Sequence, residues 1–205
     1  MKFVPALFLL IAAFVSGSIQ RHSDNDLSRP VTVSDVEHVV CHVKNGPIRS
    51  GVFTRYLGWS VGGKTYDLSS GLSISAESRL TRVRLEVSGS NIELCTGLAK
   101  HENSRFLKSP SGRGSQWSYI GLYGKQSINE DNLGIAVFYR NADEVRLTSD
   151  SLSEIVVLRP NHGRLEYYFG ATWEKEPGGI KNRSEFSRYL EATTETLNTP
   201  IRVSL

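Results

Sequence analysis

The feature that most constrains the fold is a long succession of short segments in which apolar and polar residues alternate. It runs from Val36 to Thr172, and turn residues separate the segments. Residues 79–87 show it best, because Arg82, Arg84 and Glu86 lie between apolar side chains. Alternation with a period of two predicts a β-strand with one buried face and one solvated face. A change of phase at Arg82–Val83 leaves a bulge or a register shift open there.

Two longer runs flank a pair of glycines and predict a hairpin. Residues 48–61 and 64–76 are extended in character, and Gly62-Gly63 joins them. Residues 101–114 are rich in serine, glycine and asparagine, so we predict a loop there. Long loops in compact domains often carry function. Strand-like segments resume at Trp117 and continue to Thr172.

One amphipathic helix is predicted near the C-terminus, over residues 182–197. Asn182 can cap its start, and Glu185 follows three residues later, as in a capping box. Apolar side chains then recur on one face, at Phe186, Tyr189, Leu190, Thr193 and Leu197. The stripe must be buried on a sheet, since only strands surround it in the sequence. The sequence thus predicts an antiparallel β-sandwich with one C-terminal helix, spanning residues 36–205 as one domain.

The N-terminus predicts a signal peptide over residues 1–18. Lys2 precedes an apolar run from Phe3 to Val15, and small residues follow it. A membrane anchor is the alternative, but that run is shorter than the roughly 20 residues that span a bilayer. Residues 19–35 are polar and predict a flexible leader. We expect a secreted or periplasmic protein without a membrane span in its mature chain.

Charge and cysteine content narrow the function classes. The net charge is +3 with no Lys/Arg run, so a nucleic-acid partner is not expected. Cys41 and Cys95 could pair in an oxidising compartment, or could be two buried thiols. His38 and His42 lie four residues apart on a strand, about 13 Å by the rise per residue, so a shared metal is not expected. No cofactor motif is present, and nothing indicates an oligomeric state.

The first candidate site is the junction of a strand with the polar loop. His101 could act as an acid or base near neutral pH, and Glu102 could orient it or act itself. The alternative is a surface histidine at a strand end, because no local partner is evident.

Aromatic residues form two further candidates. Trp173 comes at the end of an aromatic strand and is followed by Glu174 and Lys175, a combination that suits sugar rings. It could equally cover the edge of the core beneath the helix. The third candidate combines the aromatic face of one strand with the end of a neighbouring strand. These residues either bind a ligand or, as is more usual for aromatic side chains, belong to the core. They are Trp117, Tyr119, Tyr123, Tyr139 and Arg140.

Five segments together resemble the C-terminal part of the "domain of unknown function 4861" family. In order, they are NGPIR (45–49), GLAKH (97–101), LGIAV (133–137), YYFGATWEK (167–175) and FSRYL (186–190). The resemblance covers residues 36–205 and implies a galactose-mutarotase-like β-sandwich with carbohydrate as the ligand class. Proteins of that family are typically secreted and bacterial, often encoded near pectin- and uronate-processing enzymes of polysaccharide degradation. They are also usually about twice as long as this chain, so it matches a partial version.

The resemblance and the candidates suggest a protein that acts on or binds uronate-containing oligosaccharides. In an enzyme, His101 would move a proton in mutarotation, isomerisation or elimination, with Glu102 assisting. Arg140 or Lys175 would hold a carboxylate, and Trp173 and Tyr119 would stack on sugar rings. A non-catalytic carbohydrate-binding module and a structural β-domain are the alternatives. We expect His101 and Trp173 at the same end of the sandwich, around one depression.

Overall fold

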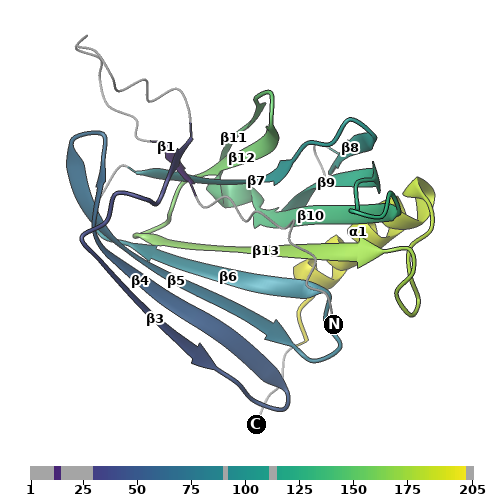
Figure 1. Cartoon of the computed structure of the whole chain (residues 1–205), viewed down its shortest axis with the longest axis horizontal. Coiled ribbons are helices and arrows are strands. Elements are labelled where there is room, and N and C mark those ends of the chain that lie inside the picture. The colour runs from purple at the N-terminus through teal and green to yellow at the C-terminus, as the bar shows by residue number, and fades with distance from the viewer. Residues whose placement is uncertain (1–11, 15–29, 90–91, 111–114, 202–205) are drawn as a thin grey trace.

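The described residues form two antiparallel sheets and one α-helix (Figure 1). The structure is a computed structural model that describes residues 12–14, 30–89, 92–110 and 115–201. The fold class predicted from the sequence, antiparallel β with a single C-terminal helix, is confirmed.

The larger sheet has eight strands and carries most of the chain. Every neighbouring pair in it is antiparallel. Its long hairpin turns at Gly62 and Gly63, whose φ angles of 58° and 72° lie in the left-handed region that glycine tolerates. The spatial order is β3 (His38–Lys44), β4 (Arg49–Val61), β5 (Lys64–Ser75), β6 (Leu80–Val87), β13 (Arg164–Trp173), β10 (Asn132–Arg140), β9 (Trp117–Lys125) and β8 (Ser104–Lys108).

The smaller sheet stacks on one face of the larger one. A short 3-10 turn, Asn141–Asp143, carries the chain from β10 into it. Two of its strands fall in the predicted signal peptide and leader, whose processing stays a prediction. The order is β11 (Glu144–Ser149), β12 (Ser153–Leu158), β7 (Glu93–Ala99), β1 (Ala12–Phe14) and β2 (Val31–Thr32).

The main core lies between the two sheets. Strand alternation sends one side-chain set of each strand inward, as with Val83, Leu85 and Val87 of β6, all at most 7% exposed. The smaller sheet supplies Leu94, Leu98, Val156 and Leu158 to the same cluster. Burial of apolar side chains between two sheets is the main stabilising contribution of a sandwich.

Helix α1 (Arg183–Asn198) packs on the opposite face of the larger sheet, over β9 and β10. The backbone N–H of Glu185 donates to Asn182 Oδ1 at 2.9 Å, and Glu185 Oε2 accepts from the N–H of Lys181 at 2.8 Å. These bonds satisfy helix-terminal donors that would otherwise lack partners. Phe186 and Leu190 are fully buried against Tyr123 and Phe138. The predicted capped helix on a sheet is therefore confirmed.

Two local expectations differ from the structure. The loop predicted over residues 101–114 contains a strand, because β8 pairs with β9 along the sheet edge. The register of β6 runs without a shift past Arg82, so no bulge lies there. The bulge of this region lies in β4 instead, between Tyr56 and Trp59.

The described residues also bear on cysteines, metals and membranes. Cys41 is exposed on β3 and Cys95 is buried on β7, and the two thiols are not bonded to each other. Within the described ranges, no cluster of three or more His, Cys, Asp or Glu could hold a metal. No helix among those residues has the length and apolarity needed to cross a membrane.

Candidate ligand-binding face

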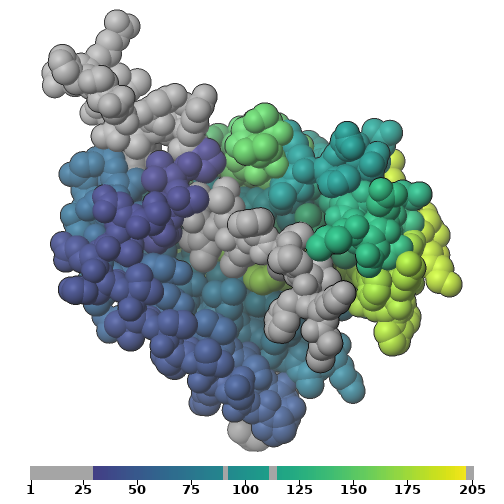
Figure 2. Space-filling model, viewed as in Figure 1, coloured from purple at the N-terminus to yellow at the C-terminus, as the bar shows by residue number. Residues whose placement is uncertain are grey.

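The face of the larger sheet that points away from the smaller sheet has two unlike halves. Helix α1 covers the half formed by β9 and β10. The other half, from β3 to β13, is open over most of its described residues, and only its edge, at Leu80 and Tyr168, packs against the cluster beneath α1. We call this uncovered half the basic face. In Figure 2 the purple and blue atoms of β3 to β5 make up one side of the molecule, and Figure 1 shows these strands lying side by side.

The strand register aligns one row of side chains straight across this face. His42 pairs with Phe53, Phe53 with Gly71, Gly71 with Arg84, and Arg84 with Glu166. Neighbouring strands lie about 4.8 Å apart, so the row from β3 to β13 is about 19 Å long. All five residues share the outward face, because the buried Val83 and Leu85 flank Arg84 in β6 and the strand register places the other four in line with it.

Two depressions lie along this row and share Arg84 and Glu86. The one over β4 and β5 has a volume of about 590 Å³, and the one beside the Asn161–Gly163 turn about 770 Å³. Basic side chains outnumber carboxylates in their lining, which contains Lys44, Arg49, Arg55, Arg84, Arg140 and Arg164 against Glu86, Asp143 and Glu166. A surface of this composition attracts anions.

Phe53 forms an aromatic platform in the first depression. Its ring lies over two glycines: a Cβ added to Gly51 or Gly71 would lie 3.2–3.4 Å from ring carbons. The ring of His42 stacks on it at 5.0 Å with an interplanar angle of 15°. Phe53 is still 37% exposed. The stacked rings of Phe53 and His42, on the same strand face as Arg49 and Arg55, form an aromatic surface that suits the apolar face of an acidic sugar.

The second depression contains a carboxylate already held by arginines. Glu166 Oε2 accepts from Arg82 Nε at 2.9 Å and from Arg84 Nε at 3.2 Å, and its Oε1 lies 3.9 Å from Arg140 Nη2. The guanidinium of Arg140 also lies over the ring of Trp117, 4.7 Å from its centroid. Guanidinium forks match carboxylates in shape and charge. This cluster therefore shows, within the protein itself, how the face binds a carboxylate.

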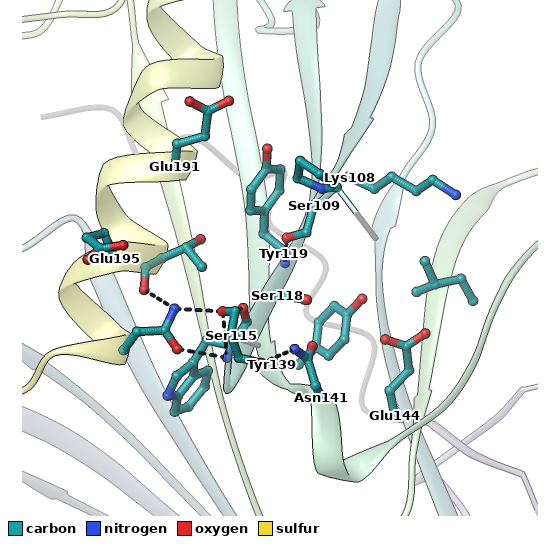
Figure 3. A pocket seen from close by; sticks show the side chains of 15 residues that line it. Lys108, Ser109, Ser115, Ser118, Tyr119, Tyr139, Asn141, Glu144, Glu191 and Glu195 are labelled. Carbon is teal, nitrogen blue, oxygen red and sulfur yellow. Dashed lines mark hydrogen bonds between the residues drawn. The ribbon is translucent and has the colours of Figure 1, made fainter. Parts of the chain in front are cut away.

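A third cavity is lined by acidic rather than basic side chains. It lies between α1 and the starts of β9 and β11, has a volume of about 1090 Å³, and presents Glu144, Glu191 and Glu195 (Figure 3). Asn198 closes one wall, since its Oδ1 accepts from the N–H groups of Gln116 and Trp117 at 2.9 and 3.1 Å. We call it the acidic pocket. Its carboxylates disfavour an anionic ligand.

Tyrosines in the acidic pocket stay protonated. Burial raises the pKa of Tyr119, and the nearby carboxylate of Glu191 raises it further. Burial also raises the pKa of Tyr139, which hydrogen-bonds Glu144. Tyr119 is 4% exposed and belongs to the cluster beneath α1. The core interpretation of the aromatic strand thus fits Tyr119 better than ring stacking with a sugar.

His101 and Trp173 lie at the same end of the larger sheet. The register runs from Trp173 to Leu133, Gly124 and Ser104, which is three strand spacings or about 14 Å. His101 is exposed in the turn before β8, where its Nδ1 accepts from the N–H of Asn103 at 3.3 Å. His101 and Glu102 line a depression of about 390 Å³, and Trp173 does not belong to its lining. His101 and Trp173 thus lie at the same end of the sheet but not around one depression.

The remaining sequence candidates are separated. Lys175 pairs with Asp131 at 2.6 Å, and that hydrogen bond is the main reason its pKa is raised. Arg140 pairs with Trp117 at the opposite end of β10 from Leu133. Seven residues of strand, about 24 Å, therefore separate Arg140 from the Trp173 end. Arg140 and Lys175 were predicted as alternative partners of a carboxylate, and they lie at opposite ends of the sheet.

A family model matches residues 17–203, and its description is "Domain of unknown function (DUF4861)". The match covers most of the chain. This chain belongs to the DUF4861 family.

Curated and solved relatives are distant. "Uncharacterized protein P7" of Formosa agariphila is 26% identical over 169 residues, which is 80% of this chain and 41% of that protein. The chain thus spans less than half the length of this curated relative. Two solved structures of the α-N-acetylgalactosaminidase NagBb from Bifidobacterium bifidum are 9% identical, with TM-scores of 0.48 and 0.44. They cover 94% and 83% of this chain and 34% and 32% of theirs. So distant a likeness carries no argument about activity.

Sequence reasoning missed most of the basic face. Of its row, it singled out none of His42, Phe53, Gly71, Arg84 and Glu166 as a ligand contact. The sequence feature that pointed to this face was the predicted solvent-exposed side of the strand at residues 79–87, which has arginines at alternate positions. Nothing local in the sequence aligns that strand with Phe53 or Glu166, because the register that does so joins segments up to 124 residues apart, from His42 to Glu166.

Proposed function

We propose that this DUF4861 chain is an extracytoplasmic protein that binds acidic, uronate-containing oligosaccharides on its basic face. The observation that carries the proposal is the cross-strand row, in which an exposed aromatic platform leads into a cluster of arginines. The family resemblance implies carbohydrate, and the charge of this face adds that the sugar is acidic.

Each part of the face has a stated role. The ring pair of Phe53 and His42 contacts a sugar ring, and Arg55, two residues from Phe53 on the same strand, holds the acid group of that sugar. Arg49 lies six residues from Arg55, about 20 Å along β4, and holds the acid group of a neighbouring sugar. Arg84 stands between the two depressions and can serve either. Arginine stays charged over the whole physiological pH range, so binding needs no titrating group.

A binding measurement with matched charge variants tests the proposal. Purified protein is titrated with oligogalacturonate and with a neutral galacto-oligosaccharide of the same length. We expect binding of the acidic ligand only. Arg84→Ala should weaken it about tenfold, the loss of one charge-assisted hydrogen bond. Arg105→Ala removes an exposed charge on β8 and should leave it unchanged. Equal affinity for both sugars, or equal effects of both variants, would refute the proposal.

A further inference from the structure

The basic side chains of the two depressions differ in how far the protein already neutralises them. In the second depression each arginine has a carboxylate partner: Arg82, Arg84 and Arg140 contact Glu166, and Arg164 contacts Glu86 at 3.1 Å. In the first, Lys44, Arg49 and Arg55 form no ion pair with any described residue. Arg49 Nη2 donates instead to the hydroxyl of Ser73 at 3.0 Å. The face is therefore asymmetric, with free charge at the β3–β4 end and compensated charge at the β13–β10 end.

The ends are too far apart to help each other through space. From β4 to β10 there are four strand spacings, about 19 Å. Charges exposed to physiological salt are screened over about 8 Å. A ligand with one acid group can therefore use one end only, and a longer ligand must lie across the strands to use both.

We propose that the ligand is an oligomer with several acidic sugars that lies along the cross-strand row, anchored at Phe53, and that Glu166 competes with it at the arginine end. This deepens the proposed function and rests on it. The anchor is the first depression because its cations are free and its aromatic ring is exposed. The second depression binds more weakly because an acid group there must share Arg82, Arg84 and Arg140 with Glu166.

Glu166 is accordingly a specificity-determining residue. Its carboxylate is only 18% exposed and is held by arginines from two flanking strands. A weakly acidic or short ligand gains little by competing with it. A ligand that carries an acid group on each sugar arrives already anchored, so its second group competes at a high effective concentration.

A ladder of oligogalacturonates tests the inference by isothermal titration calorimetry. Affinity should rise steeply between the dimer and the longest oligomer in the wild-type protein. Arg49→Ala should weaken every length about tenfold, whereas Arg140→Ala should weaken only the long oligomers. Arg140→Lys keeps the charge and checks that lost stacking on Trp117 is not the cause. Melting temperatures confirm that each variant is folded.

The decisive variant is Glu166→Gln, which has the same shape without the charge. We expect it to bind the long oligomers several-fold more tightly than the wild type, and to bind the dimer equally well, because a dimer anchored at Phe53 does not reach Glu166. Unchanged or weaker binding of the long oligomers by a folded Glu166→Gln protein would overturn the role of Glu166. A flat length series, or Arg140→Ala affecting dimer and long oligomers alike, would overturn the spanning ligand while leaving acidic-sugar binding intact. If no acidic sugar binds at all, the proposed function itself fails. A sulfated oligosaccharide without carboxylates, measured in parallel, distinguishes recognition of the carboxylate from binding of any anionic sugar.

Discussion

The two halves of the outer face of the larger sheet belong to one antiparallel sheet, but their outward side chains differ. On β9 and β10 the outward side chains are aromatic and aliphatic, and α1 buries them. On β4, β5 and β6 the outward residues that line the first depression are arginines, serines, glycines, Phe53 and Glu86, and the surface stays open. One half therefore supports the fold, and the other is available to a ligand.

The two halves differ in coverage because apolar side chains on one half would be unfavourable in water, whereas the polar side chains on the other half are solvated. A stripe of Trp117, Tyr119 and Phe138 would be a large exposed apolar patch without α1. Arg84, Ser69 and Ser73 need no cover. Gly51 and Gly71 remove side chains altogether, and the ring of Phe53 fills the space they leave. The small residues thus create the depression, and the arginines at its rim give it charge.

The largest expected contrast comes from truncating a phenylalanine in each half. Phe186 is fully buried and stacks on Tyr123 at 5.3 Å, so Phe186→Ala should lower the free energy of unfolding by about 3–5 kcal/mol. Phe53→Ala removes a side chain that is 37% exposed and should cost less than about 1.5 kcal/mol. Denaturant unfolding measures both.

The same pair should reverse in a ligand titration. Phe53→Ala should weaken oligogalacturonate binding about tenfold, on the scale of aromatic truncation at a binding hot spot. At a temperature where it is folded, Phe186→Ala should bind like the wild type. If Phe53→Ala proves as destabilising as Phe186→Ala, both halves are structural and the comparison fails.

A smaller contrast comes from adding one methyl group to a glycine in each half. In Gly134→Ala the new Cβ would lie 2.3 Å from Phe186 Cε2 and 2.6 Å from Thr172 Oγ1, so overpacking should cost about 1–3 kcal/mol. In Gly71→Ala the nearest atom is Phe53 Cδ1 at 3.3 Å, and that exposed ring can tilt away. The expected change in stability is then within about 0.5 kcal/mol. Thermal melts of the two proteins decide this, and equal losses would show that the open half is packed as tightly as the covered one.

The covered half was largely predictable from the sequence, and the basic face was not. Helix α1 can be predicted from its local sequence alone, because Asn182 and Glu185 cap it and its apolar residues recur with a helical period. The burial of Trp117 and Tyr119 follows from their alternation. The strand β8 was missed because three of its five residues are polar and none is buried, so only pairing with β9 defines it.

The site was harder to predict because it is a property of register rather than of any segment. His101, Glu102 and Trp173 were chosen as polar or aromatic residues at strand ends, a local criterion. The row from His42 to Glu166 crosses five strands, and each contributes one unremarkable residue. Only the hydrogen-bonded alignment of the strands turns these residues into one surface.

The smallest expected effect on the fold, and the sharpest challenge to the comparison, comes from His101. His101→Ala removes an exposed ring that accepts a hydrogen bond from the Asn103 N–H, so the free energy of unfolding should change by no more than about 0.5 kcal/mol. If the protein acts only through its basic face, oligogalacturonate binding should also be unchanged. The matched control is His162→Asn, a second exposed turn histidine that lines the Arg140 depression. Asparagine tolerates its positive φ of 49°. A screen for product formation on pectic oligosaccharides completes the test.

If the wild-type protein turns over a substrate and His101→Ala abolishes turnover with binding intact, His101 acts mainly on the transition state. The reacting sugar would then lie at the β8 end of the sheet, beside Glu102 and beyond the reach of the basic face. The open half would at most hold the rest of the chain, and the division of the outer face into a supporting half and a ligand-binding half would no longer stand.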